Sequence, residues 1–176
     1  ERVTRDLLFK ERPAAVVQVA DAKNLRRTLL ITLELAEFKI PMILALNMTD
    51  EARERGIEID AARLSKILGI PVVETVGVTG EGMTDLRKAV AKAAVPSIKV
   101  AYLSEIAAAL SEVESALPEN PGKTFIAQSI LCKDLTIWPA LSHVFSSPEK
   151  VRETALARAD RILKSFVRSF SLLSLD

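Results

Sequence analysis

The sequence has little of what a disulfide-stabilised, metal-binding or nucleic-acid-binding protein needs. Cys132 is its only cysteine and His143 its only histidine. One cysteine excludes an internal disulfide framework and a cysteine-based zinc site, and it favours a reducing compartment. The 24 basic and 23 acidic residues leave a net charge of +1, so charge gives no argument for a nucleic-acid partner.

Long hydrophobic runs are also missing, so these residues predict neither a membrane span nor a signal peptide. Nevertheless 49% of the residues are hydrophobic, enough to bury the core of one domain or of two small ones. The first residue is Glu1 rather than methionine, and residues 1–10 already have helical periodicity. We therefore expect the chain to be the later part of a longer one.

The stretch that organises the chain is I-P-M-I-L-A-L-N-M-T-D, from Ile40 to Asp50. Its apolar part predicts a strand buried on both faces. Asn47 and Asp50 follow that strand, at the edge where open α/β sheets bind ligands. N-x-x-D is the pattern with which P-loop GTPases recognise guanine, through a carboxylate that accepts from the base. The alternative for so short a pattern is a polar turn in which Asp50 caps the next helix.

Strands and helices alternate through the first half of the chain, which predicts an α/β fold with a parallel sheet. Asp60 is a suitable helix N-cap, and Gly69 followed by Pro71 is a stop signal. A glycine-rich loop, G-V-T-G-E-G, follows the last strand. The predicted strands are Ala14–Ala20, Ile40–Leu46 and Pro71–Val76; the predicted inward helical positions are Val3, Leu7, Leu8, Leu25, Leu29, Leu33, Ala36, Leu64, Ile67, Leu68, Leu86 and Val90.

From about Pro96 the pattern becomes helical, so we predict one domain over 1–95 and a small all-helical domain over 96–176. Phe125–Leu131 predicts one helix, residues 141–145 part of another, and Pro148 opens the longest. The predicted packing positions are Ile106, Leu110, Val113 and Leu117 on the first helix and Leu156, Ala159, Leu163, Phe166 and Phe170 on the last.

Several segments together resemble one family. They are V-V-Q-V-A-D-A-K-N-L, then L-E-L-A-E-F-K-I-P-M-I-L-A-L-N-M-T-D-E-A, then G-I-E-I-D, I-L-G-I-P-V-V-E-T-V and G-E-G-M-T-D-L. Over residues 1–94 the chain looks like the G domain of ferrous iron transport protein B, a P-loop GTPase-like parallel sheet with flanking helices. The second half is similar in position and helix content to that family's helical domain, which couples the G domain to the membrane permease.

The resemblance implies a guanine-nucleotide site that takes GTP or GDP. Asn47 and Asp50 match the guanine-recognition motif, and Met48 stands where many GTPases have a lysine over the base. Thr75, Val76 and Gly77 fall where the family's last nucleotide-contacting loop lies. Because Val76 offers no hydroxyl, the resemblance implies that backbone N–H groups contact the base oxygen there.

The sequence contains no G-x-x-x-x-G-K-[ST] motif, so we assign no catalytic residue and no metal ligand. The resemblance places the P-loop, the switch regions and the Mg²⁺ ligands upstream of Glu1, in an N-terminal part of the G domain that is expected as a partner. Gly122, Lys123 and Thr124 spell G-K-T, but Leu117 stands where a P-loop has its first glycine. Lys123 is therefore predicted to be a solvated loop residue.

The remaining singletons favour structural interpretations. We predict that His143 is at or near the surface, that Cys132 is a small core residue, and that Trp138 lies in the core or at a domain contact. Arg158, Arg161, Lys164 and Arg168 line one side of the last helix. They indicate a solvated face or, alternatively, a juxtamembrane helix on the cytoplasmic side.

Two functions from different classes remain. The first is the guanine-nucleotide-binding portion of a GTPase module that regulates ferrous iron transport, at the cytoplasmic face of the cell membrane, with the permease part of the same transporter as partner. The second is a non-catalytic interaction module that has lost nucleotide binding. In either case the apolar strand Ala14–Ala20 is expected to form an open sheet edge through which the chain can self-associate.

Overall fold

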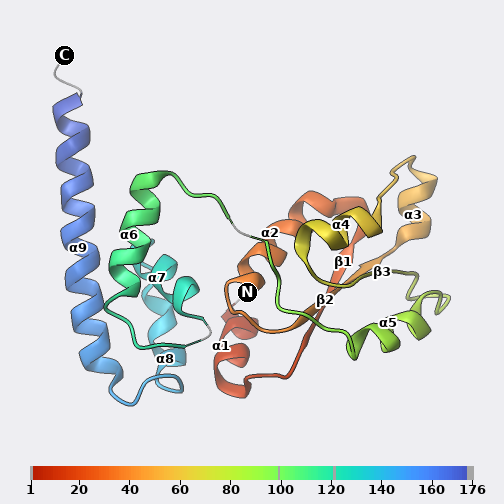
Figure 1. Cartoon of the computed structure of the whole chain (residues 1–176), viewed down its shortest axis with the longest axis horizontal. Coiled ribbons are helices and arrows are strands. Elements are labelled where there is room, and N and C mark those ends of the chain that lie inside the picture. Colours follow the sequence, from red (N-terminus) through yellow and green to blue (C-terminus); the bar gives the residue numbers. More distant parts are fainter. Residues whose placement is uncertain (1, 99, 121, 174–176) are drawn as a thin grey trace. The chain divides into compact units, whose positions relative to one another are not determined.

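The computed structural model describes residues 2–98, 100–120 and 122–173, and it divides into two compact units (Figure 1). The sheet unit is Pro13–Val100, and the helical unit combines Glu1–Arg12 with Ala101–Asp176. The division after Val100 lies close to the domain limit predicted between residues 95 and 96. The opening helix, which we had placed with the sheet, groups with the other helices instead.

The face of the opening helix α1 (Arg2–Glu11) explains that difference. Val3 and Leu7, both predicted to point inward, are 83% and 54% exposed, whereas Leu8 and Phe9 are buried. Arg5 is buried with them because Asp134 and Thr136 of the helical unit accept hydrogen bonds from its guanidinium group. A charged residue thus occupies an inward position, and hydrophobic periodicity alone does not identify that face.

The sheet unit contains three parallel strands in the order β1-β2-β3: β1 (Val16–Asp21), β2 (Met42–Asn47) and β3 (Val72–Thr75). The fold class predicted from the sequence is confirmed. The central strand β2 is almost completely buried, as its uninterrupted apolar sequence predicts. In register, Asp21 stands beside Asn47 and Asn47 beside Thr75, so three polar residues meet at the carboxyl edge of the sheet.

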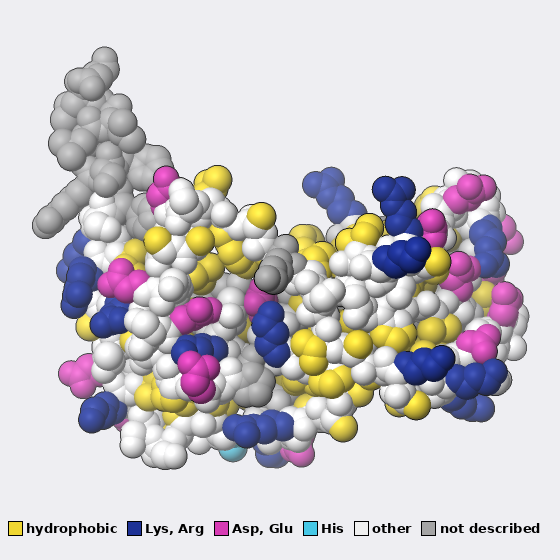
Figure 2. Space-filling view, viewed as in Figure 1, with side chains coloured by type: hydrophobic (Ala, Val, Ile, Leu, Met, Phe, Trp, Pro, Cys, Tyr) yellow, Lys and Arg dark blue, Asp and Glu magenta, His cyan; other side chains and the backbone are white. Residues whose placement is uncertain are grey.

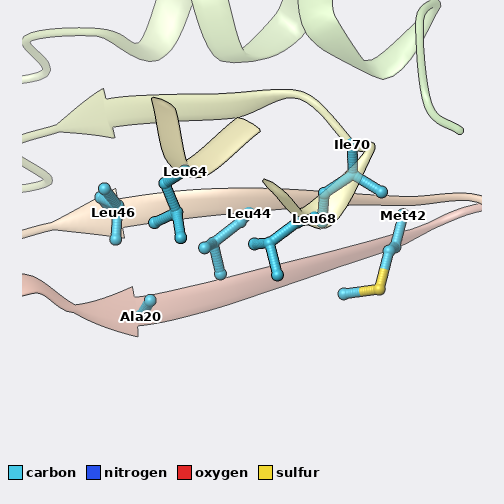
Figure 3. Packing of buried hydrophobic residues seen from close by; sticks show 7 residues of the cluster. All are labelled: Ala20, Met42, Leu44, Leu46, Leu64, Leu68 and Ile70. Atoms are coloured by element: carbon cyan, nitrogen blue, oxygen red, sulfur yellow. The ribbon is translucent and has the colours of Figure 1, made fainter. Parts of the chain in front are cut away.

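The helices of the sheet unit connect these strands. Leu64 and Leu68 of α4 lie against Leu44 and Leu46 of β2 in one hydrophobic core (Figure 3). Asp60 caps α4 by accepting from the N–H of Arg63, as predicted. The short 3-10 turn η1 is Ala22–Asn24, and the α-helices are α2 (Leu25–Ala36), α3 (Thr49–Glu54), α4 (Ala61–Leu68) and α5 (Met83–Val90).

Two predicted core positions of this unit are wrong. Ile67 is 55% exposed and Val90 is 46% exposed, while Ala89 is buried. Both helices are only eight residues long. On each helix the neighbouring residue, Leu68 or Ala89, is the one that is buried.

The helical unit is formed by α1 and by the helices after residue 100. Trp138 is buried, as predicted, and the guanidinium carbon of Arg152 lies 5.7 Å from its ring centroid. Cys132, predicted to be a core residue, is exposed because it follows the last turn of α7. The other elements are α6 (Ser104–Glu114), α7 (Lys123–Leu131), the 3-10 turn η2 (Leu135–Ile137), α8 (Trp138–Leu141) and α9 (Pro148–Leu173).

The long helix α9 begins at Pro148, as predicted, and of its predicted packing positions Ala159 is fully buried. Ala155, Ala159 and Ile162 are buried, whereas Leu156 and Leu163 are only half-buried. On α6, Ile106 is 43% exposed, whereas Leu110 and Val113 are buried, as is Leu117 after the end of the helix. The side chains of Phe166, Arg168 and Phe170 lie outside the described residues. Within the described part of the chain, no helix is both long and apolar enough to cross a membrane.

Candidate functional site

The carboxyl ends of β2 and β3 are joined through the side chain of Asn47. Its Oδ1 accepts a hydrogen bond of 2.9 Å from the N–H of Gly77. Oδ1 also lies 3.4 Å from the hydroxyl of Thr75. Asn47 and the segment from Thr75 to Gly77, which the sequence assigned to one site, are therefore brought together. The amide side chain fixes the position of one loop relative to the other.

Met48 and Asp50 are presented by the turn into α3. Met48 has a left-handed backbone, with φ 62° and ψ 36°, and its side chain is 37% exposed. This conformation is uncommon for a residue other than glycine or asparagine. Asp50 is an exposed residue of the first helical turn, and none of the described residues pairs with its carboxylate. The helix cap is Met48, so the alternative in which Asp50 caps the helix is wrong.

The loop after β3 folds back on itself and uses its first two N–H groups. The N–H of Val76 donates to the carbonyl of Glu81 at 3.1 Å, and that of Gly77 donates to Asn47. Both N–H groups belong to the loop that the resemblance implies as a contact to a base oxygen, and both already have acceptors within the chain. Val78 is 98% exposed, and its N–H has no acceptor among the described residues, so it is the first available donor of the loop.

Gly82 is what allows the loop to close. Its φ is 76°, and a Cβ atom there would lie 2.0 Å from the carbonyl oxygen of Glu74. Only glycine fits so close to the β3 backbone. The turn holds Val76 in the interior, with 2% exposure, and leaves Val78 exposed.

The turn after β1 contributes a third group of polar residues beside α3. The carboxylate of Asp21 accepts from the side-chain amide of Asn24 at 2.8 Å and from the N–H of Lys23 at 2.9 Å. The hydrogen bond from Asn24 is the main reason that the pKa of Asp21 lies below its ordinary value. The ammonium group of Lys23 pairs with Glu51 of α3 at 2.5 Å.

Sequence reasoning missed Thr49, Lys23 and Val78. The hydroxyl of Thr49 is buried and donates to the carbonyl of Thr75 at 3.3 Å. The signal for Thr49 was a polar residue inside the N-x-x-D motif. Nothing in the sequence indicates the partner of Lys23, because Glu51 is 28 residues away.

The turn into α3 offers an exposed carboxylate and a thioether, and the loop after β3 offers a backbone donor. An acceptor and a donor of this kind suit a planar ring that carries N–H groups and a carbonyl oxygen. No cluster of three or more potential metal ligands occurs in the described residues. Gly122 and Lys123 open the helix α7, and Lys123 pairs with Glu119 with its side chain 19% exposed, so it is less solvated than predicted.

A family model for ferrous iron transport protein B matches residues 1–90. An Fe(2+) transport protein A/Fe(2+) transporter FeoB fusion protein of Porphyromonas gingivalis is 46% identical over 87 residues, covering 49% of this chain and 10% of that protein. The Fe(2+) transporter FeoB of Escherichia coli is 44% identical over 75 residues, covering 43% of this chain and 10% of the transporter. The chain thus spans about a tenth of the length of these curated relatives.

Solved structures of cytosolic FeoB domains cover nearly the whole chain. An S. thermophilus NFeoB variant bound to GDP and AlF4⁻ superposes with a TM-score of 0.72 at 27% identity, over 94% of this chain and 66% of that one. The cytosolic domain of T. maritima FeoB in its apo form gives a TM-score of 0.69 at 26% identity, over 93% and 71%. With a matching sheet topology and a family model over half its length, this chain belongs to the ferrous iron transport protein B family and has the G-domain fold of its N-terminal part.

Proposed function

We propose that this chain is the guanine-recognising portion of a GTPase module that regulates ferrous iron transport. The observation that carries the proposal is the hydrogen bond between Asn47 and Gly77, which joins the two loops that a base must contact at once. In support, structures similar to this chain have been solved with GDP-type ligands. From family membership we also expect that the chain is part of a whole transporter, that the permease is its partner, and that it lies at the cytoplasmic face of the membrane.

The chemistry assigns a separate role to each residue. The carboxylate of Asp50 accepts from the N1–H and the exocyclic amine of guanine, and the N–H of Val78 donates to the base oxygen. Met48 covers one face of the ring with its thioether and carbon chain. Adenine has no N1–H and no amine beside it at position 2. Binding adenine would therefore desolvate the Asp50 carboxylate without replacing its hydrogen bonds to water.

The test is an NMR titration of the 176-residue chain with GMP and AMP, followed through the amide signals of Asp50 and Val78. We expect saturable shifts with GMP and much smaller ones with AMP. Asp50→Asn should weaken GMP by at least about tenfold, since charge-assisted hydrogen bonds contribute about 1.5–3 kcal/mol each. The same variant should bind XMP better, because an amide can donate to the additional oxygen of xanthine.

Equal responses of the unsubstituted chain to GMP and AMP would contradict guanine recognition. Shifts with neither nucleotide would favour the interaction module that has lost nucleotide binding. Asp85→Asn is the matched control, because Asp85 is also an exposed aspartate in the first turn of a helix of the same unit. It should leave GMP binding unchanged.

A further inference from the structure

Helix α3, which presents Asp50, is too short to hold its own position. It has six residues, Thr49–Glu54, fewer than an isolated helix needs for stability in water. Its N-cap residue, Met48, makes no side-chain capping hydrogen bond. The orientation of the Asp50 carboxylate therefore depends on what the neighbouring elements do to α3.

Among the described residues, polar side-chain contacts join α3 to neighbouring elements through Thr49, Glu51 and Arg53, the residues on either side of Asp50 and the next alternate one. Thr49 reaches the carbonyl of Thr75 at the end of β3. Arg53 pairs with Glu74 of β3, and Glu51 pairs with Lys23 in the turn after β1. Glu51 thus ties α3 to the β1 side of the sheet, and the other two residues tie it to the β3 side.

The contact of Lys23 is the better fixed of the two ion pairs. The Lys23 side chain is 13% exposed, whereas that of Arg53 is 56% exposed. Lys23 is also held at its own backbone, because its N–H donates to the carboxylate of Asp21. Asp21 in turn accepts from the side chain of Asn24. A lysine side chain that is largely buried on a hydrogen-bonded turn gives α3 a defined anchor, while the more exposed side chain of Arg53 is more strongly screened by solvent.

We propose that Lys23 is a positioning residue for base recognition: its ion pair with Glu51 sets the angle at which α3 presents Asp50. This rests on the proposed function, in which Asp50 accepts from guanine. The N1–H and the exocyclic amine must both donate to the Asp50 carboxylate. If α3 rotates, the hydrogen bond from the amine is lost before the one from N1–H. Loss of the Lys23 pair should therefore reduce the discrimination between guanine and hypoxanthine, which lacks the amine.

The experiment compares GMP with IMP by NMR titration for the unsubstituted chain and for Lys23→Met, which keeps the carbon chain and removes the charge. We expect the ratio of GMP to IMP affinity to fall by roughly three- to fivefold, the size that a partly exposed ion pair supports. Glu51→Gln should produce the same fall from the other partner, and Lys23→Arg should restore most of the ratio. Lys88→Met is the control, since Lys88 forms an exposed pair with Asp85 on α5.

A purely structural role of Lys23 would weaken GMP and IMP equally and leave their ratio unchanged, and that result would overturn the proposal. An equal fall in Lys88→Met would overturn it as well. Failure of the proposed function looks different, because the unsubstituted chain would then not distinguish GMP from AMP at all. Thermal unfolding of each variant shows whether the fold is retained, and if Lys23→Met does not fold, Glu51→Gln decides the question.

Discussion

The sheet unit and the helical unit use polar side chains in different ways. In the helical unit the guanidinium group of Arg5 is buried and connects α1 to Asp134 and Thr136. In the sheet unit the polar groups gather at the carboxyl edge of the strands, around Asn47. The first arrangement fastens helices to one another, and the second leaves an acceptor and a donor open to a ligand. Polar substitutions should therefore change stability in one unit and binding in the other.

The largest effect should come from Arg5→Met, which tests the helical side of this comparison. It removes the hydrogen bonds that a side chain only 7% exposed donates to Asp134 and Thr136. We expect the free energy of unfolding to fall by about 3–4 kcal/mol, because the hydrogen bonds of a buried guanidinium group to Asp134 and Thr136 are lost together. Because Trp138 is the only tryptophan and lies in the helical unit, urea unfolding followed by its fluorescence measures that unit.

Lys10→Met is the matched control for Arg5→Met. Lys10 lies on the same helix and pairs with Glu11, but its side chain is 62% exposed, so its loss should cost less than about 0.5 kcal/mol. GMP binding by the sheet unit should be the same in both variants. If Arg5→Met loses GMP binding and Lys10→Met does not, polar substitutions in the helical unit also affect binding, and the comparison is wrong.

The second prediction concerns a hydroxyl group in the loop after β3. The sequence suggested Val76 as the position for it, but Val76 is buried, so Val76→Ser should cost about 1–3 kcal/mol of stability by burying an unpaired hydroxyl. Gly77 is exposed, and a Cβ there would meet Asn47 Oδ1 at 3.4 Å, an ordinary contact. Gly77→Ser should therefore fold normally.

Relaxation-dispersion NMR at partial GMP saturation measures the release rate of the base from these variants. We expect Gly77→Ser to slow release by about threefold, through one additional neutral hydrogen bond and a loop that is less costly to order. Gly77→Ala separates the two causes, since it stiffens the loop without adding a hydroxyl. If the release rate is the same in all three chains, the loop does not limit release.

The smallest effect on folding should come from Val17→Lys on the open edge of the sheet. β1 is an edge strand in the described sheet, and its Val17 and Val19 are 41% and 67% exposed. Hydrophobic side chains reach the surface of the sheet unit on the face shown in Figure 2. Unpaired edges of this kind recruit further strands, so we expect concentration-dependent self-association that Val17→Lys reduces with little change in stability.

Light scattering over a range of protein concentrations measures this association. Val100→Lys is the control, because Val100 is a comparably exposed valine of the same unit, 36% exposed, outside the strands. A chain that stays monomeric at high concentration and does not respond to Val17→Lys would mean that the edge is protected. The two units would then differ only in the polar groups at the carboxyl ends of the strands.

The order of strands and helices in the sheet unit was predictable from the sequence, because each signal is local. The apolar run of β2 specifies a fully buried strand, and Asp60 and Gly69 mark the ends of α4 through their own backbone and side-chain chemistry. The pairing of Asn47 with the segment around Thr75 was also predictable, since parallel strands bring their carboxyl ends to one edge.

The tertiary structure decided what depends on contacts between distant residues. Arg5 shows this for the fold. Its guanidinium group can be buried only because acceptors on other elements, such as the hydroxyl and the carbonyl of Thr136, bind it. Lys23 and Val78 show it for the candidate site, because the ion pair of Lys23 with Glu51 and the hydrogen bonds that occupy the donors before Val78 form only in the folded chain. Hydrophobic periodicity encodes burial along one helix or strand, but a partner for a polar group exists only after the chain has folded.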